Sequence, residues 1–372
     1  MKAKATDYLI YDRESGTYRE DPEQAVRDDV EKHYWLNVLR AVIKDWRLYL
    51  MLVPMILVFL FWRYLPMYEL LRCFKIDGSE AVPVSEWAYK GFSNFRALLF
   101  GTSTNAVMSQ EFWMAMRNTF ILSFYGLCFG FPMPIILALF FNEIRSNGYR
   151  SILQVMTYLP KFMSTVIMTS LVMLLVKGAV STKTMETLPG IVSQLLVNVG
   201  VISQETANSG LLHTSQYFRA IYHISGIWET AGYDSIVFFA AIIAISPTSY
   251  EAAQIDGAGK WAQMRYVVLP SILSTIVIML ITRIGSMLSI GYEKVILLTE
   301  DLKKTTPDDV MTTAQVVSTF AWKYTGQSAA GGSTTARPGI GAAAEMLNNV
   351  IGMLLVIGAN TIARKASNIS LY

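Results

Sequence analysis

Four ionisable side chains interrupt long apolar segments of this sequence. Glu229 and Asp234 lie in one segment, Arg283 in the next and Glu345 in the last. If these segments cross a membrane, a charged side chain that faces lipid near the bilayer centre costs at least about 2.5 kcal/mol. We therefore expect the four side chains to face a bundle interior, a cavity or a protein interface. There they could contact a polar solute; alternatively, Glu229 or Asp234 pairs with Arg283 or meets a second protein.

The segment that carries Glu229 and Asp234 also contains hydroxyl and aromatic side chains. Thr230 and Asp234 are one helical turn apart and so share one face of a helix. Ligands rich in hydroxyl groups, such as sugars, are bound by a few polar groups set among apolar and aromatic ones. The sequence therefore contains one candidate solute pathway, made of Trp228, Glu229, Thr230, Tyr233, Asp234, Arg283 and Glu345.

Other patterns argue against catalysis and cofactor binding. Gly259-Lys260 is followed by Trp261, where a phosphate-binding loop has Ser or Thr, so we expect no ATP site in this chain. The three histidines, His33, His213 and His223, have no spacing typical of metal ligands. No nucleophile and general base stand out. We expect no catalytic residue, no metal and no cofactor.

The elements that must position the pathway residues are membrane helices. Hydrophobic residues make up 53% of the 372-residue chain and charged residues only 16%, whereas an average globular domain has about 25% charged residues. A net charge of +3 is too small to indicate a nucleic-acid partner. A helix that crosses the hydrocarbon needs about 20 apolar residues. We therefore predict an all-α polytopic membrane protein with six transmembrane helices: Leu48–Tyr64, Thr119–Phe141, Ile152–Val176, Ala220–Ile245, Leu269–Ile290 and Ile340–Ile362.

Lysine and arginine residues near the ends of the predicted spans indicate the orientation. The first apolar run begins only after 46 residues of mixed charge, so we expect no cleaved signal peptide. The short segments that carry the basic residues all lie on one side, which places both termini in the cytoplasm. These residues are Lys44, Arg47, Arg145, Arg150, Lys260, Arg265, Arg364 and Lys365.

Two segments outside the six spans are also apolar. Val30, Tyr34, Val38 and Val42 recur at every fourth residue, which predicts an amphipathic helix along the inner membrane surface. Such a helix either anchors the chain or also binds a partner. The run 188–203 is too short for a span and is expected to be a re-entrant or surface helix on the outer side.

The cytoplasmic link over residues 247–270 carries the clearest functional pattern. Thr248 and Glu251 have the spacing of a capping box, so we expect a short helix to begin there. Gly257 or Gly259 should end it, because glycine tolerates the left-handed conformation at a helix end. A second short helix would follow and complete a helix–turn–helix in the cytosol. On these grounds alone it could be an ordinary capped loop.

The same link resembles the EAA motif of permease subunits in bacterial ABC importers, which reads Glu-Ala-Ala, three residues, Gly, nine residues, Ile, one residue and Leu-Pro. Here the motif begins at Glu251 and continues to Gly257 and Pro270, and only Val267 departs, by replacing isoleucine. In that family the loop is the coupling helix, which docks on the ATPase. The resemblance implies that Glu251 offers charge to a cationic partner and that Gly257 sets the turn. The implied docking residues are Tyr250, Glu251, Ala252, Ala253, Asp256 and Gly257.

Further segments extend the resemblance over about residues 45–365. Asn118-Thr119, Tyr158–Pro160, Gly226–Trp228 and Gly291–Leu298 are similar to segments of sugar-importer permeases of the maltose, glycerol-phosphate and oligosaccharide type. The resemblance implies a five-helix type I importer core and one half of a pathway for an oligosaccharide or sugar derivative, which operates by alternating access. It also implies four kinds of partner: a second, non-identical permease, two ABC ATPase subunits, an extracytoplasmic solute-binding protein and the lipid of a bacterial plasma membrane.

These observations divide the chain into regions and leave two alternatives open. The regions are a cytoplasmic N-terminal segment with an interfacial helix (1–46), the first span and an extracytoplasmic loop (47–118), the permease core (119–365) and a cytoplasmic tail (366–372). One alternative is a permease for a non-sugar or anionic solute, which Arg219 and Arg283 would suit. The other is a secondary transporter that needs no ATPase, against which the EAA-like link argues.

Overall fold

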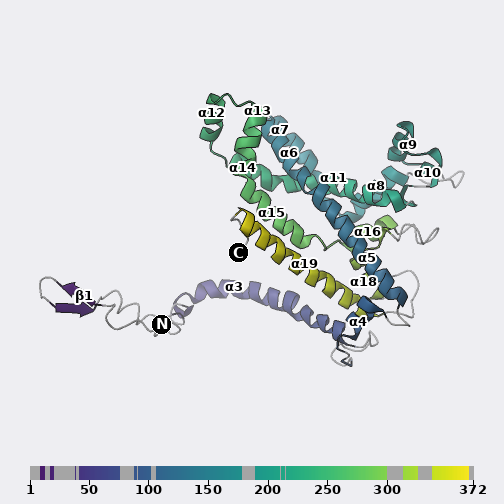
Figure 1. Cartoon of the computed structure of the whole chain (residues 1–372), viewed down its shortest axis with the longest axis horizontal. Helices are drawn as coiled ribbons and strands as arrows, with labels where there is room; N and C mark the ends of the chain where they lie inside the picture. Colours follow the sequence, from purple (N-terminus) through teal and green to yellow (C-terminus); the bar gives the residue numbers. More distant parts are fainter. Residues whose placement is uncertain are drawn as a thin grey trace. The chain divides into compact units, whose positions relative to one another are not determined.

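A computed structural model of the chain describes most of the predicted spans and links (Figure 1). The described residues are 9–12, 17–20, 38, 42–75, 88–89, 91–101, 106–177, 189–209, 211–213, 215–299, 313–325 and 337–367. Most of the predicted N-terminal interfacial helix lies outside these residues. The chain divides into two compact units, Met1–Glu69 and Leu70–Tyr372.

The first unit combines a small hairpin with an apolar helix. Strands β1 (Leu9–Asp12) and β2 (Thr17–Glu20) pair antiparallel, with Leu9 opposite Glu20, and depart from the all-α prediction. Helix α3 (Trp46–Phe59) continues through the π-helical η1 (Leu60–Tyr64) into the 3-10 helix η2 (Leu65–Phe74), which reaches into the second unit. No residue of α3 is buried in the protein, although almost all are apolar. A helix with this surface is suited to contact with lipid.

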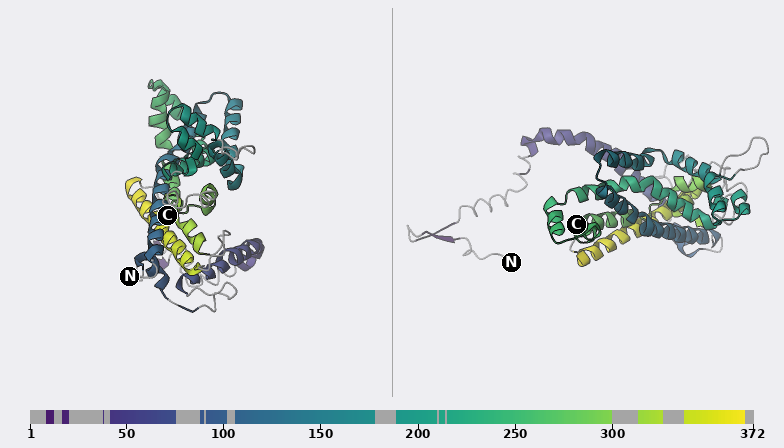
Figure 2. Two further views of the ribbon diagram at one scale, coloured as in Figure 1. Left: turned by 90° about the vertical axis from the view of Figure 1, so that its right-hand side faces the viewer. Right: turned by 90° about the horizontal axis from the view of Figure 1, so that it is seen from above.

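The second unit is built from helices of very different length, as Figures 1 and 2 show. In chain order they are α4 (Ser93–Phe100), α5 (Ala106–Tyr125), η4 (Gly126–Gly130), α6 (Pro132–Glu143), α7 (Asn147–Tyr158), η5 (Leu159–Phe162), α8 (Thr165–Lys177), α9 (Ile191–Asn198), α10 (Gln204–Ser209), η6 (Leu211–His213), α11 (Ser215–Ile243), α12 (Pro247–Ile255), α13 (Lys260–Gln263), η7 (Met264–Val268), α14 (Leu269–Ser271), α15 (Leu273–Ser286), α16 (Tyr292–Thr299), α18 (Val317–Tyr324) and α19 (Pro338–Ser367). The prediction of a helical membrane protein is confirmed. The 188–203 run contains α9, which is too short to cross a bilayer.

Each of the six predicted spans lies on a long apolar helix or on a bent pair of helices. Four helices are continuous: Trp46–Phe74, Ala106–Glu143, Ser215–Ile243 and Pro338–Lys365. Two are bent pairs: Asn147–Phe162 with Thr165–Val176 at 102°, and Lys260–Ser271 with Leu273–Ser286 at 62°. Pro160 and Pro270 lie just before the two breaks, where proline removes a backbone donor and disfavours a straight helix.

The helices that carry the predicted pathway are held by close packing of α6 and α11. Phe238 and Ile242 of α11 pack with Ala138 of α6 in a buried apolar cluster that also contains Val268 and Ile272. Gly232 of α11 lies directly against the backbone carbonyl of Thr157 in α7, and a Cβ atom there would collide with it. Glycine is therefore required at this crossing, because no side chain fits between the two backbones.

The pair Gly126 and Gly130 does not make the close helix contact expected from a Gly-xxx-Gly pattern in a membrane helix. The two residues lie in the π-helical turn η4, and an ideal Cβ atom at either position would have its nearest neighbour at 3.9–4.0 Å. The space beside them is instead part of a cavity.

Candidate functional site

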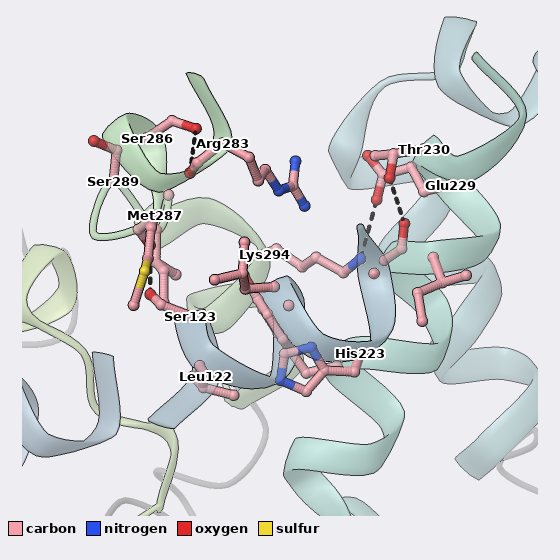
Figure 3. A pocket seen from close by; sticks show the side chains of 18 residues that line it. Leu122, Ser123, His223, Glu229, Thr230, Arg283, Ser286, Met287, Ser289 and Lys294 are labelled. Carbon is pink, nitrogen blue, oxygen red and sulfur yellow. Dashed lines mark hydrogen bonds and ion pairs between the residues drawn. The ribbon is translucent and has the colours of Figure 1, made fainter. Parts of the chain in front are cut away.

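A polar cavity of about 320 Å³ lies among η4, α11, the end of α15 and the turn into α16 (Figure 3). Its walls combine ionisable and hydroxyl side chains with glycine and aliphatic residues. The lining residues include Ser123, Gly126, Gly130, Tyr222, His223, Gly226, Glu229, Thr230, Arg283, Ser286, Ser289 and Lys294. The volume is at the lower end of the range for small-molecule sites. The position of the cavity within a set of apolar helices makes it the candidate solute site.

One wall of the cavity is closed by a buried ion pair. Lys294 Nζ of α16 lies 3.0 Å from Glu229 Oε2 of α11, and both side chains are only 14% exposed (Figure 3). Lys294 Nζ also lies 5.5 Å from the centre of the Tyr222 ring, within the distance for a cation–π contact. Burial removes both charges from water, so each depends on the other for compensation.

Arg283 is the second cation of the cavity and differs from Lys294 in its contacts. Its guanidinium projects into the space between α15 and α11 (Figure 3). It makes no ion pair or hydrogen bond with a side chain or backbone group among the residues that the structure describes. Gly130 faces it across the cavity, with its ideal Cβ position 3.9 Å from Arg283 Nη2. The charge of Arg283 is therefore available to a ligand or to another protein.

The hydroxyl groups in the walls keep their acceptor positions for a ligand. Thr230 Oγ1 donates to the Gly226 carbonyl oxygen at 3.1 Å, and Ser286 Oγ donates to the carbonyl oxygens of Thr282 and Arg283 at 3.3 Å. Each hydroxyl has one hydrogen and two lone pairs, so donation to the helix leaves the oxygen able to accept. Nε2 of His223 is buried and has no hydrogen-bond partner among the described residues.

The structure brings together three of the seven predicted pathway residues. Glu229, Thr230 and Arg283 line the cavity. The sequence left open an ion pair of Glu229 or Asp234 with Arg283. In the structure Glu229 pairs with Lys294 instead. Asp234 lies one helical turn beyond Thr230, close enough to Arg283 and Lys161 to interact electrostatically with both.

The other three predicted pathway residues lie away from the cavity. Trp228 lines a separate apolar pocket of about 430 Å³ between α8, α9 and α11. Tyr233 packs edge-on against Phe162, with ring centres 5.9 Å apart. Glu345 is half-buried in α19. Neighbouring residues of the segment 228–234 therefore face different sides of α11, since Trp228 and Glu229 line different pockets.

Lys294 and His223 are cavity residues that the sequence patterns did not single out as pathway residues. One sequence signal could have identified Lys294. It is a cation directly before the apolar run Val295–Leu298, in a stretch that resembles sugar permeases. The spacing of His223 excludes a metal site and predicts no other role for it in the pathway. The pattern of one helix face could not connect Lys294 with Glu229, because Lys294 is 65 residues away in sequence.

The link over residues 247–270 forms a second candidate site at the opposite end of α11 from α9 and α10 (Figure 1). Helix α12 starts at Pro247 after Ser246, and no side chain caps it, so the predicted capping box at Thr248 is wrong. Thr248 Oγ1 is hydrogen-bonded to Ser246 Oγ at 2.7 Å instead. Gly257 follows α12 with φ of +76°, as expected for a glycine that ends a helix.

The exposed face of the link contains apolar as well as charged side chains. Glu251, Ala252, Asp256 and Gly257 are exposed, and Ile255 is 87% exposed. Trp261 is 73% exposed and Tyr266 72% exposed. Large exposed apolar side chains on a polar link are typical of a surface that binds another protein.

Two side-chain contacts join the link to the end of α6. Tyr250 makes a side-chain hydrogen bond with Asn142, and burial raises the pKa of its phenol above the usual value even though this hydrogen bond acts in the opposite direction. Tyr250 therefore stays neutral at physiological pH. Lys260 Nζ lies 3.3 Å from Glu143 Oε2, with the two side chains 71% and 36% exposed. The link is thus attached to the helix that packs on α11.

Comparison with known proteins shows which family this chain resembles. A model of the inner membrane component of binding-protein-dependent transport systems matches residues 130–291, which include the link and the α11 and α15 walls of the cavity. The chain is 32% identical over 340 residues to protein LplB of Bacillus subtilis, which covers 91% of this chain and 94% of that protein. It is 33% identical over 340 residues to the B. subtilis polygalacturonan/rhamnogalacturonan transport system permease protein YteP, which covers 90% and 93%.

A solved structure agrees with this assignment. A chain of a bacterial ABC transporter involved in the import of the acidic polysaccharide alginate matches with a TM-score of 0.70 and 36% identity, over 89% of this chain and 99% of that chain. A second structure shows a bacterial alginate ABC transporter in complex with an alginate pentasaccharide-bound periplasmic protein, and its matching chain has a TM-score of 0.70. The chain therefore belongs to the family of inner membrane components of binding-protein-dependent transport systems, as the pattern of residues 247–270 predicts.

Proposed function

We propose that this chain is one of two permease subunits of an ATP-driven importer and forms half of the pathway for an oligosaccharide or sugar derivative. The observation that carries the proposal is the polar cavity within apolar helices, in a chain whose full-length relatives include carbohydrate permeases. The chain itself has no predicted nucleotide loop, so hydrolysis of ATP is assigned to two separate ATPase subunits. A second, non-identical permease and a solute-binding protein on the outer side complete the assembly.

The cavity is the proposed solute site. Glu229, Thr230 and Arg283 form its polar walls with Lys294 and His223. Asp234 extends the polar face of α11 toward the cytoplasmic end. Trp228, Tyr233 and Glu345 remain proposed pathway residues only where the second permease would face them, since they lie outside this cavity.

The link is the proposed docking site for the ATPase. Its docking residues are those that the motif implies: Tyr250, Glu251, Ala252, Ala253, Asp256 and Gly257. We expect the closing ATPase pair to move α12, and the contacts of Tyr250 with Asn142 and of Lys260 with Glu143 to carry that movement to α6. Since α6 packs on α11, the movement reaches the cavity. Alternating access then follows from contacts that differ between two states.

The proposed topology treats each bent pair as one span. This gives six spans with both termini in the cytoplasm, in a multi-pass protein of the bacterial plasma membrane. The regions 1–46, 47–118, 119–365 and 366–372 retain the roles proposed from the sequence. The α12–α13 link then lies on the cytoplasmic side, where an ATPase can reach it.

The test is ATP-driven uptake by the complete complex. Affinity purification through this chain should recover a second permease and an ATPase, and the reconstituted complex should accumulate a labelled oligosaccharide only with ATP inside and binding protein outside. A complex without an ATPase subunit, or uptake that proceeds without ATP, would favour the alternative of a secondary transporter and refute the proposal.

A further inference from the structure

We infer that Arg283 is a carboxylate-binding residue and that the solute of the cavity is an acidic sugar, of the class of uronic acids. The inference rests on the proposed function and goes further by naming the chemical class of the solute and the group that recognises it.

The residues that line the cavity include two cations, Arg283 and Lys294, and one carboxylate. Glu229 is the only carboxylate among the lining residues, and it lies 3.0 Å from Lys294 Nζ. The negative charge of Glu229 is therefore already compensated by Lys294. Asp234 acts on Arg283 electrostatically but forms no ion pair with it. A cation within membrane-spanning helices typically faces a water-filled cavity or pairs with an anion and marks the path of a solute, and the solute is the group that enters this space.

The chemistry of Arg283 suits a carboxylate rather than a neutral sugar. A guanidinium offers a planar fork of N–H donors that matches the two oxygens of a carboxylate. The guanidinium lines the cavity and projects into it (Figure 3). A neutral hydroxyl-rich sugar would not balance the charge.

The remaining walls suit the rest of a sugar ring. The oxygen of Ser286 has donated its hydrogen to helix carbonyls and can accept from a sugar hydroxyl. Thr230 shares its hydrogen between the Gly226 carbonyl and the side chain of Asp234, and its oxygen can also accept. The unpartnered Nε2 of His223 adds one more hydrogen-bonding atom. The cavity thus has one carboxylate site and several hydroxyl sites, in a volume of about 320 Å³.

The alternative occupant of the Arg283 site is a carboxylate of the second permease, because Arg283 is exposed in the single chain. The acidic sugar is favoured because the guanidinium lines the same cavity as the hydroxyl acceptors, and because a pairing with another subunit would leave the His223 nitrogen unexplained. The two occupants give different results in the following experiment.

The experiment measures equilibrium binding to the purified permease–ATPase complex without the binding protein, so that the selectivity of the binding protein plays no part. The probes are labelled trigalacturonate and its carboxyl-reduced, neutral counterpart. The variants are Arg283→Gln, which removes the charge, and Arg283→Lys, which keeps it without the fork. Arg96→Gln is the matched control, since Arg96 is an exposed residue of α4 outside the cavity.

We expect the wild-type complex to bind the acidic probe at least about tenfold more tightly than the neutral one. Arg283→Gln should remove most of this difference and leave the affinity for the neutral probe within about twofold, whereas Arg283→Lys should retain part of the difference. Arg96→Gln should bind like the wild type. If Arg283→Gln does not co-purify with the ATPase, Arg283→Lys and the steeper salt dependence of acidic-probe binding in the wild type provide the test.

Three results would overturn the inference: equal affinity of the wild type for both probes, no binding of either, or an equal loss for both probes in Arg283→Gln. The last result, together with loss of the second permease, would identify an inter-subunit ion pair. None of these results touches the proposed function, which is refuted instead by a complex without an ATPase subunit or by the absence of ATP-driven uptake of any oligosaccharide.

Discussion

A lysine–glutamate pair closes one wall of the cavity, and another joins the link over residues 247–270 to α6, but the two pairs have opposite physical settings. Lys294 and Glu229 are each 14% exposed, whereas Lys260 and Glu143 are 71% and 36% exposed. Removal of one partner of a buried pair strands a charge and costs about 3–5 kcal/mol. An exposed pair contributes about 0–1 kcal/mol. The comparison shows that the pair of Lys294 and Glu229 belongs to the buried wall of the cavity, whereas the pair of Lys260 and Glu143 lies at the protein surface.

The first prediction breaks the buried pair. Glu229→Gln should destabilise the complex by about 3 kcal/mol, because Lys294 keeps its charge without a carboxylate. The measurement is thermal unfolding of the purified complex. The double variant Glu229→Gln/Lys294→Met removes both charges and should recover most of the loss. If the single and double variants are equally unstable, the ion pair is not what stabilises this wall.

The second prediction concerns the helix crossing beside the cavity. Gly232→Ala should destabilise the complex by about 1–3 kcal/mol, because the new Cβ atom would collide with the Thr157 carbonyl and push α11 from α7. The same thermal assay applies. Gly358→Ala is the matched control, since Gly358 lies in α19 with no atom within 4 Å of its ideal Cβ position. Equal effects of the two substitutions would contradict the close crossing.

The third prediction tests the exposed link. Glu251→Arg should lower uptake about tenfold, the effect of losing one charge-assisted hydrogen bond at the docking surface, with no change in the unfolding temperature of the permease. The readouts are transport and ATPase activity in the reconstituted complex. Gln254→Arg adds the same side chain at another exposed position of α12 and is the control. Normal coupling in Glu251→Arg would remove the docking role proposed for this residue.

The fourth and smallest effect concerns the exposed pair. Glu143→Gln should change stability by less than about 1 kcal/mol, because water solvates Lys260 when the carboxylate is lost. Uptake should fall only about twofold if the contact transmits movement of the link to α6. The charge-reversed double variant Glu143→Lys/Lys260→Glu should restore that twofold loss. A loss of stability as large as that of Glu229→Gln would erase the distinction between the two regions.

The sequence by itself determined the features that depend on local order along the chain. Apolar runs of membrane-spanning length predicted where the long helices lie, because a helix in a bilayer must satisfy its backbone hydrogen bonds within one segment. The spacing from Glu251 to Pro270 predicted the family. Gly257 as a helix end was predicted for the same reason, since its role depends only on its own backbone angle.

Only the tertiary structure decided which charges meet. Glu229 pairs with Lys294 of another helix, whereas Trp228, its neighbour in sequence, points into a different pocket. The 102° and 62° bends of two predicted spans are likewise features that no hydropathy pattern measures. The physical reason is that a buried charge is stabilised by the groups within a few ångströms of it, and here Glu229 and its partner Lys294 are 65 residues apart in sequence.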